Sequence, residues 1–193
     1  MIQMEAKNLA DLYGLPLVDW DRVEARLSRG PEALAGTGGS DNRSWLATTN
    51  ADGSPHLTGL GPLYVPGLFY FTTGEATRKA RNLARDPRCT LGISTDEFDL
   101  AVEGDAALVD DPDVVVEGDA HQVTDPPVVA AMAERWAAEG WPCRVDETGR
   151  ALTADFSAPS AGPPPWRVYR ITPRQATAVL AAAPGGATRW RFR

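Results

Sequence analysis

The stretch that decides the fold is WLATTNADGSPHLTGLGPLYVPGLFYFTTG, residues 45–74. It has the pattern of a strand, a tight turn, a second strand, a second turn and a third strand. Asp52-Gly53 is a strong hairpin signal, and Pro66-Gly67 marks the next chain reversal. We therefore predict three adjacent strands at the centre of the fold.

The residues before this stretch are predicted to be helical. The segment MEAKNLADLYG (4–14) ends on a glycine, and VDWDRVEARLSRG (18–30) begins with an acid-rich turn and ends at a Gly-Pro pair. Trp20, Val23 and Leu27 lie on one face at helical spacing, which predicts that they pack against the rest of the protein. We expect an N-terminal helical extension over residues 1–35.

The residues after the central stretch continue a mainly β pattern. The chain has 16 prolines and 18 glycines, which favour many turns and short strands over a helical bundle. Since no βαβ alternation is visible, we predict a mainly β fold with flanking helices (α+β), a barrel-like sheet in one domain over residues 40–193. The expected later elements are a helix after residue 74, strands at 88–94, 98–109 and 114–123, a helix at 125–140, an extended proline segment at 157–166, strands at 166–172 and 175–182, and an aromatic, basic tail at 185–193.

Composition excludes several function classes. The net charge of −7 argues against nucleic-acid binding and against docking on anionic lipid. No apolar run approaches the length of a membrane span, and the first residues lack the layout of a signal peptide, so we expect a cytoplasmic protein with no membrane partner. Cys89 and Cys143 are two separate cysteines, which does not indicate a disulfide framework.

The side chains that usually carry catalysis are scarce. The chain has two histidines, His56 and His121, and they are far apart and not in the spacing of a metal site. No nucleophile elbow, phosphate-binding loop or dinucleotide fingerprint is present. If the protein is an enzyme, we expect a bound cofactor rather than a metal or a side-chain nucleophile to supply the chemistry.

The helix that follows the central strands carries an unusual charge pattern. From Arg78 to Arg85 it contains four cations and no acid, although the chain is acidic overall. Cations at the amino end of a helix oppose its dipole unless an anion neutralises them. Thr72 and Glu75 have the spacing of a capping box, so we predict that the helix begins there. The alternative is that these four cations simply form the solvated face of a surface helix.

We favour a phosphate site at this helix. The backbone N–H groups of its first turn, with Arg78, Lys79 and the amide of Asn82, would converge on the phosphate. Arg81 and Arg85 are assigned to the solvated side of the same helix.

These residues resemble a known family. The strand, DG turn, "PH" strand, aromatic strand ending in Thr-Gly and "RK..NL..DPR" helix are similar to the pyridoxamine 5'-phosphate oxidase-like split β-barrel proteins. The similarity covers residues 40–125, and the tail resembles an actinobacterial branch. The resemblance implies a split β-barrel of six or more antiparallel strands. It also implies a homodimer whose site lies between two subunits and holds FMN or the deazaflavin coenzyme F420.

The resemblance also assigns roles to individual residues. It places the cofactor phosphate on Arg78, Lys79 and Asn82, and Thr72 and Thr73 help to close the same pocket. It implies that the strand with Pro55, His56, Leu57 and Thr58 runs along the ring system. Trp190, with Arg189 and Arg191, would reach the partner's pocket and lie against the ring, or else would anchor the interface.

The RK..NL wording resembles the F420-using branch more than the FMN-using one. We therefore expect F420H2-dependent hydride transfer to a small, electron-poor organic substrate, with His56 as a candidate proton donor or a strand residue that only hydrogen-bonds. The alternatives are an FMN-dependent oxidase or reductase and a non-catalytic protein that binds flavin, deazaflavin or tetrapyrrole. No side-chain set for the phosphate of pyridoxamine phosphate is evident, and the N-terminal extension and the 146–166 insertion could cover or fill the site.

Overall fold

One antiparallel sheet organises the backbone of the protein. The computed structural model describes residues 4–29, 44–108, 127–158 and 160–193. Within these residues the sheet has eleven strands, and its main path runs β1-β11-β10-β7-β6-β2-β3. The strands are β1 (Met4–Asn8), β2 (Ser44–Thr49), β3 (Pro55–Gly59), β4 (Leu63–Val65), β5 (Leu68–Thr73), β6 (Arg88–Ser94), β7 (Phe98–Leu108), β8 (Arg144–Val145), β9 (Ala151–Thr153), β10 (Trp166–Leu180) and β11 (Ala187–Phe192).

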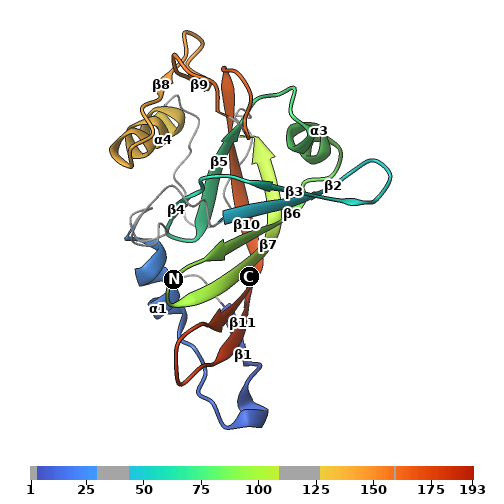
Figure 1. Cartoon of the computed structure of the whole chain (residues 1–193), viewed down its shortest axis with the longest axis vertical. Helices are drawn as coiled ribbons and strands as arrows, with labels where there is room; N and C mark the ends of the chain where they lie inside the picture. The colour runs from blue at the N-terminus through green and yellow to red at the C-terminus, as the bar shows by residue number, and fades with distance from the viewer. Residues whose placement is uncertain (1–3, 30–43, 109–126, 159) are drawn as a thin grey trace.

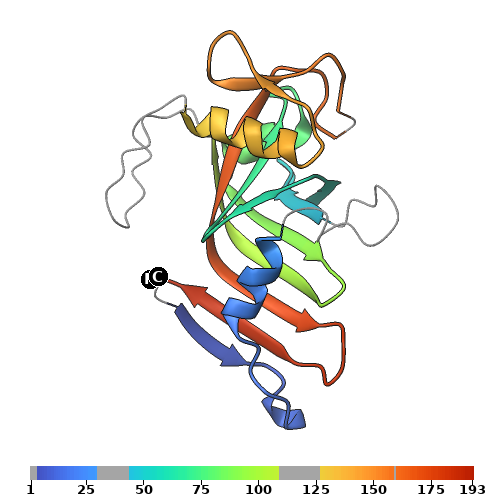
Figure 2. The same ribbon diagram turned by 90° about the vertical axis from the view of Figure 1, so that its left-hand side faces the viewer.

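Few helices accompany the sheet in the described residues. They are the 3-10 helix η1 (Asp11–Tyr13) and the α-helices α1 (Trp20–Leu27), α3 (Arg78–Arg85) and α4 (Pro127–Ala138). Helix α4 with β8 and β9 lies at one end of the molecule and β1 with β11 at the other, as both views show (Figures 1 and 2). The prediction of a mainly β, α+β fold built as a split β-barrel is confirmed, and none of the described helices has the length and apolar character of a membrane span.

Strand β10 is the longest strand and joins the two ends of the sheet. Its first half pairs with β5 and β9, its second half pairs with β11, and β7 runs alongside most of it. The register with β7 shifts between Pro173 and Gln175, where the ladder has a bulge. Opposite this bulge a Cβ at Gly104 would lie 2.3 Å from the carbonyl oxygen of Thr172, so β7 can approach only with glycine there.

The prediction of two separate strands at 166–172 and 175–182 is therefore wrong in one respect. Proline has no N–H to donate and usually ends a ladder, which suggested a break at Pro173. In the structure the bulge absorbs the proline and the strand continues to Leu180. The predicted tail at 185–193 is likewise a strand, β11, because it pairs with the second half of β10.

Both predicted hairpin turns are present. Gly53 and Gly67 have φ angles of 83° and 82°, which only glycine adopts without strain. The first turn connects β2 to β3, and the N–H of Asn50 donates to the carbonyl of Ser54 at 2.8 Å. The second turn connects β4 to β5.

The prediction of a helix over residues 4–14 is wrong. Met4–Asn8 forms β1 and pairs with β11, and only Asp11–Tyr13 turns helically, as η1. Five mostly exposed residues gain little by burying a helical face, whereas the edge of β11 offers a full set of backbone partners. The predicted domain boundary falls within residues 30–43, and the predicted strand at 114–123, with His121, also lies outside the described residues.

The second predicted N-terminal helix is confirmed as α1. The Asp19 side chain caps it by accepting a hydrogen bond from the N–H of Asp21 at 3.2 Å. Trp20, Val23 and Leu27 are all buried, as their spacing predicted.

Trp190 lies in the main core together with α1. Its side chain is 1% exposed, and its ring meets that of Trp20 edge-on with centroids 5.2 Å apart. The core also contains Phe69, Phe71, Leu91, Phe98 and Ile171. The prediction that Trp190 reaches a partner's pocket or anchors an interface is therefore wrong, because alternation along β11 turns the indole inward, under α1.

Replacing Trp190 by alanine tests this assignment. We expect Trp190→Ala to lower the free energy of unfolding by about 3–5 kcal/mol, because it empties a large buried volume. Urea unfolding measures the change, with Leu12→Ala as the matched control, since Leu12 is 90% exposed in η1. A loss for Trp190→Ala no larger than for the control would contradict the core position.

Candidate functional site

Helix α3 begins later than the sequence indicates. Its N-cap is Thr77, whose hydroxyl accepts from the N–H of Ala80 at 3.3 Å and donates to the carbonyl of Gly74 at 2.8 Å. The predicted capping box of Thr72 and Glu75 is therefore wrong, because Gly74 and the two residues after it form a turn before the helix. Glu75 instead pairs with Arg167, with 3.1 Å between Oε1 and Nε.

The cations of α3 do lie at its amino end, and no acid accompanies them in the first turn. Arg78 is exposed, and no hydrogen bond or ion pair joins its side chain to any residue that the structure describes. Arg81 donates to the carbonyl of Ala76 at 2.5 Å, and Arg85 donates to the carbonyl of Thr49. Of the three arginines, Arg78 is the one available to an external anion.

Lys79 is buried, with 2% of its surface exposed. Its ammonium group donates to the backbone carbonyl of Ser160, which belongs to the predicted insertion. Burial lowers the pKa of Lys79 from its ordinary value. A buried cation held by one neutral carbonyl is incompletely compensated, so this position favours additional negative charge nearby.

Asn82 is also buried, but its amide is used within the protein. Its Nδ2 donates to Thr48 Oγ1 and to Asn50 Oδ1, each at 3.1 Å. These bonds fasten α3 to the hairpin of β2 and β3. The structure therefore places Asn82 beside the predicted site, where it positions the helix against the sheet.

The four predicted residues of β3 divide between two faces. Successive residues of a strand point to opposite sides, so His56 and Thr58 share one face while Pro55 and Leu57 share the other. Thr48 is opposite His56 in the ladder and holds Asn82, so the His56 face is the one on which α3 packs. A ring system on one side of β3 could meet only one of these pairs from the same chain.

His56 has an unsatisfied atom in the site. Its Nδ1 is buried, and no described residue hydrogen-bonds to it. The pKa of His56 is lowered by burial first and then by the positive charges of Arg78 and Lys79. Burial and the two neighbouring cations therefore all favour the neutral form of the His56 imidazole.

The two threonines at the end of β5 also point to opposite sides. Thr73 is buried, and its hydroxyl lies 2.8 Å from that of Thr77, so it supports the start of α3. Thr72 lines a pocket on the other side of the strand. The structure thus divides the pair that the sequence assigned to a single pocket.

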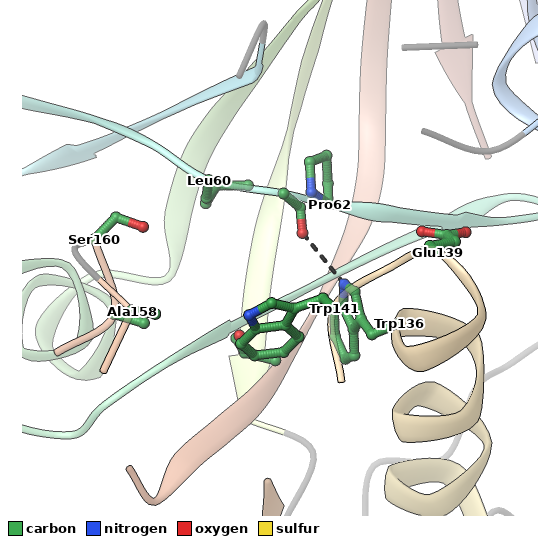
Figure 3. A pocket seen from close by; sticks show the side chains of 10 residues that line it. Leu60, Pro62, Trp136, Glu139, Trp141, Ala158 and Ser160 are labelled. Atoms are coloured by element: carbon green, nitrogen blue, oxygen red, sulfur yellow. Dashed lines mark hydrogen bonds between the residues drawn. The ribbon is translucent and has the colours of Figure 1, made fainter. Parts of the chain in front are cut away.

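This pocket has a volume of about 270 Å³ (Figure 3). Its walls come from the connection before β4, from β5, from α4 and the residues just after it, and from the insertion. The lining residues are Leu60, Gly61, Pro62, Thr72, Trp136, Glu139, Trp141, Ala158, Ser160 and Ala161. Sequence reasoning missed Trp136, Glu139 and Trp141, because the spacing of the predicted helix at 125–140 shows an amphipathic face but not what that face covers.

The insertion forms a wall between the pocket and α3. Ser160 lines the pocket, and its backbone carbonyl accepts a hydrogen bond from the ammonium group of Lys79. The N–H of Gly74 donates to the carbonyl of Ala161 at 2.9 Å, and a Cβ at Gly74 would lie 2.8 Å from that same oxygen. The described part of the insertion therefore lies directly against the start of α3.

Comparison with known proteins identifies the family. The sequence profile described as pyridoxamine 5'-phosphate oxidase matches residues 32–180, most of the chain. The chain belongs to this family. No curated protein matches the sequence.

Several solved structures have a fold similar to that of this member of the pyridoxamine 5'-phosphate oxidase family. An FMN binding protein related to pyridoxamine 5'-phosphate oxidase, from Nostoc punctiforme PCC 73102, is 20% identical, with a TM-score of 0.53 over 90% of this chain and 91% of that one. A conserved hypothetical protein from Mycobacterium tuberculosis is 20% identical, with a TM-score of 0.51 over 83% of each chain. A heme binding protein from Mycobacterium smegmatis is 18% identical, with a TM-score of 0.50 over 84% of this chain and 56% of that one. At these identities the likeness concerns the fold.

The electrostatic contact between His56 and Arg78 can be tested directly. We expect the pKa of His56 to be higher in Arg78→Gln than in the wild type, because the substitution removes a positive charge that disfavours the imidazolium form. An NMR titration of the imidazole resonances measures it, with His56→Gln to assign the signal.

The control for this titration is Arg81→Gln. Arg81 is exposed on the same helix but is not among the charges that act on His56. Equal pKa values of His56 in the wild type and in Arg78→Gln would show that the guanidinium lies too far away to act.

Proposed function

We propose that this member of the pyridoxamine 5'-phosphate oxidase family is a cofactor-dependent oxidoreductase. In this proposal F420H2 binds with its phosphate at the start of α3 and reduces a small, electron-poor organic substrate. The family itself supports the coarser function, an oxidoreductase that uses a flavin or a deazaflavin.

The observation that carries the proposal is the cluster of His56, Arg78 and Lys79. Two cations and a buried imidazole nitrogen without a partner among the described residues lie at the positive end of a helix that has no acid in its first turn. Each uncompensated cation there costs roughly 0.3–1 kcal/mol. A phosphate would accept hydrogen bonds and neutralise the charges in a single step, so the residues present fit a phosphate-bearing cofactor.

The chain's own groups would divide the work of holding this phosphate. Arg78 is exposed and can form the ion pair without rearrangement. Lys79 is buried and contributes its positive charge to the site. Its ammonium group would contact a phosphate oxygen directly only by giving up its hydrogen bond to the carbonyl of Ser160. An anion at this point also raises the pKa of His56, which allows its imidazole to donate a hydrogen bond or to hold a proton near the ring.

The chemistry of hydride transfer would come from the bound reduced deazaflavin. The protein's share is to orient the ring along the His56 face of β3, to exclude water and to position the substrate. The pocket beside Thr72 provides a cavity next to the proposed site, and no described side chain needs to act as a nucleophile there.

FMN is the alternative cofactor, since it also carries a phosphate at the end of its ribityl chain. The Nostoc relative is named as an FMN binding protein. The motif at Arg78-Lys79 and Asn82-Leu83 supports F420 through its resemblance to the F420-using branch. A purified protein with the two-banded flavin spectrum would favour FMN, whereas a colourless protein that takes up F420 would favour the proposal.

A non-catalytic function is supported by two hydrogen bonds. The carbonyls of Ser160 and Ala161 already accept hydrogen bonds from Lys79 and from the N–H of Gly74, as a segment that restricts access to a site would do. A protein that only binds or stores a flavin, deazaflavin or tetrapyrrole would bind its ligand tightly and show no turnover with any of a panel of acceptors.

The proposed active form is a homodimer with the site between its subunits. The outer face of β2 and β3 exposes Trp45 and Leu57, which are 49% and 63% exposed. Gly59 and Gly92 flank Trp45 in the ladder and leave the surface flat. An aromatic and an aliphatic side chain on a flat strand face are typical of a protein interface.

The phosphate site predicts the behaviour of a double variant. Replacing Arg78 and Lys79 together by alanine should weaken cofactor binding by roughly a hundredfold or more, because each charged hydrogen bond contributes about 1.5–3 kcal/mol. Titration with F420 and with FMN measures the affinities, and Arg81→Ala with Arg85→Ala is the charge-matched control. Thermal unfolding and the dimer mass show that the variant stays folded; unchanged affinity in such a protein would disprove the phosphate assignment.

The dimer face predicts a second result. Leu57→Asp should convert the dimer to a monomer, because a charge would be buried at the centre of the interface. Light scattering coupled to size exclusion gives the mass. Leu12→Asp, at an apolar side chain that is 90% exposed in η1, should leave the mass unchanged. A Leu57→Asp protein that remains dimeric would move the interface elsewhere.

A further inference from the structure

The pocket beside Thr72 has features that the proposed cofactor site does not use. Two of its walls come from α4 and from the residues just after it, and the facing wall comes from Leu60–Pro62 and the insertion (Figure 3). Its volume of about 270 Å³ is several times the share of one water molecule, about 30 Å³, so it has room for a compact organic molecule.

The aromatic walls of this pocket are rigid. The rings of Trp136 and Trp141 stand at 78° to each other with centroids 5.9 Å apart, so they form two adjoining walls. Trp136 is fixed by its Nε1, which donates to the carbonyl of Gly61 at 3.4 Å. Trp141 is supported by the ring of Trp166 at 5.0 Å. Two such indoles favour a cation or a flat apolar body lying against them.

The charge of the pocket is negative. Among the ten described lining residues, Glu139 is the only one with a charged side chain. Burial raises the pKa of its carboxyl group, and the charge of Arg135 opposes that shift. The guanidinium of Arg135 donates to the carbonyl of Tyr64 at 3.0 Å, and no ion pair joins Glu139 to any residue that the structure describes. The carboxylate is therefore half-buried without a direct counter-charge.

We propose that this pocket binds a small aromatic cation, with its ammonium group toward Glu139 and its ring against Trp136 and Trp141. The class follows from the lining: indole faces attract cations, and a half-buried carboxylate is stabilised by one. Neutral or anionic molecules of the same size would gain less from these walls. The inference goes beyond the proposed function, because the binding itself needs no cofactor.

The test compares benzylammonium with benzyl alcohol, two probes of similar shape that differ in charge at neutral pH. Calorimetry on the full-length protein measures both affinities. We expect benzylammonium to bind the wild type at least about tenfold more tightly than benzyl alcohol. Equal affinities would overturn the inference.

Variants locate the binding. Glu139→Gln keeps the shape of the side chain and should remove most of the preference for benzylammonium. Trp141→Leu should lower the affinity for both probes. The matched control is Glu134→Gln, an exposed acid on the same helix, which should change neither affinity. Thermal unfolding checks that each variant is folded. A benzylammonium affinity that is the same in Glu139→Gln and wild type would overturn the inference.

The same measurement separates this inference from the proposed function. Protein saturated with F420 or FMN should still bind benzylammonium, because the pocket lies on the opposite side of β5 from the start of α3. Displacement of benzylammonium by either cofactor would show that the ring occupies this pocket, and would overturn the inference. Benzylammonium binding in a protein that takes up neither cofactor would contradict the proposed function and leave the inference standing.

Discussion

The continuous pairing of β10 is the constraint on which the rest of the structure depends. Its first half carries β5 and β9, and with them the pocket and the insertion, while its second half carries β11 and so β1. The two halves can belong to one strand because the bulge at Pro173 bends the ladder and Gly104 lets β7 follow it. A side chain at Gly104 would separate β7 from β10 at the bend. The end of the molecule with the pocket and the end with β11 and β1 would then lose the strand pairing that joins them.

The start of α3 holds cations in positions that are unfavourable for the helix, and its bonds to the sheet keep them there. Four cations on one short helix repel each other, and burying Lys79 adds a desolvation cost. The helix stays in place because Asn82 fastens it to β2 and Thr77 caps it with support from Thr73. Arg85 adds a bond from its guanidinium group to the carbonyl of Thr49 in β2. Of the four cations, Arg78 is the one that no described residue engages, as is usual where a site departs from what stability alone would select.

The sequence predicted the elements whose signals are local and missed those that depend on distant partners. Turns at Gly53 and Gly67 and the buried face of α1 could be read directly, since φ angles and helical spacing are properties of neighbouring residues. Strand β1 could not, because five exposed residues become a strand only when β11 lies beside them. For the same reason the motif could single out Arg78, Lys79 and His56 for a proposed site, but not the inward orientation of Trp190 or the pocket walls from α4.

Two neighbouring threonines connect the proposed anion site to the pocket. Thr73 faces the start of α3 and Thr72 faces the pocket, so β5 separates the two by the thickness of one strand. Ser160 touches both, since it lines the pocket and its carbonyl holds Lys79. An anion can take Lys79 from this carbonyl and leave the wall in place, because the N–H of Gly74 still donates to the neighbouring carbonyl of Ala161. The anion site and the pocket are therefore adjacent but can be occupied together, since the segment between them is held by backbone hydrogen bonds that neither ligand needs to break.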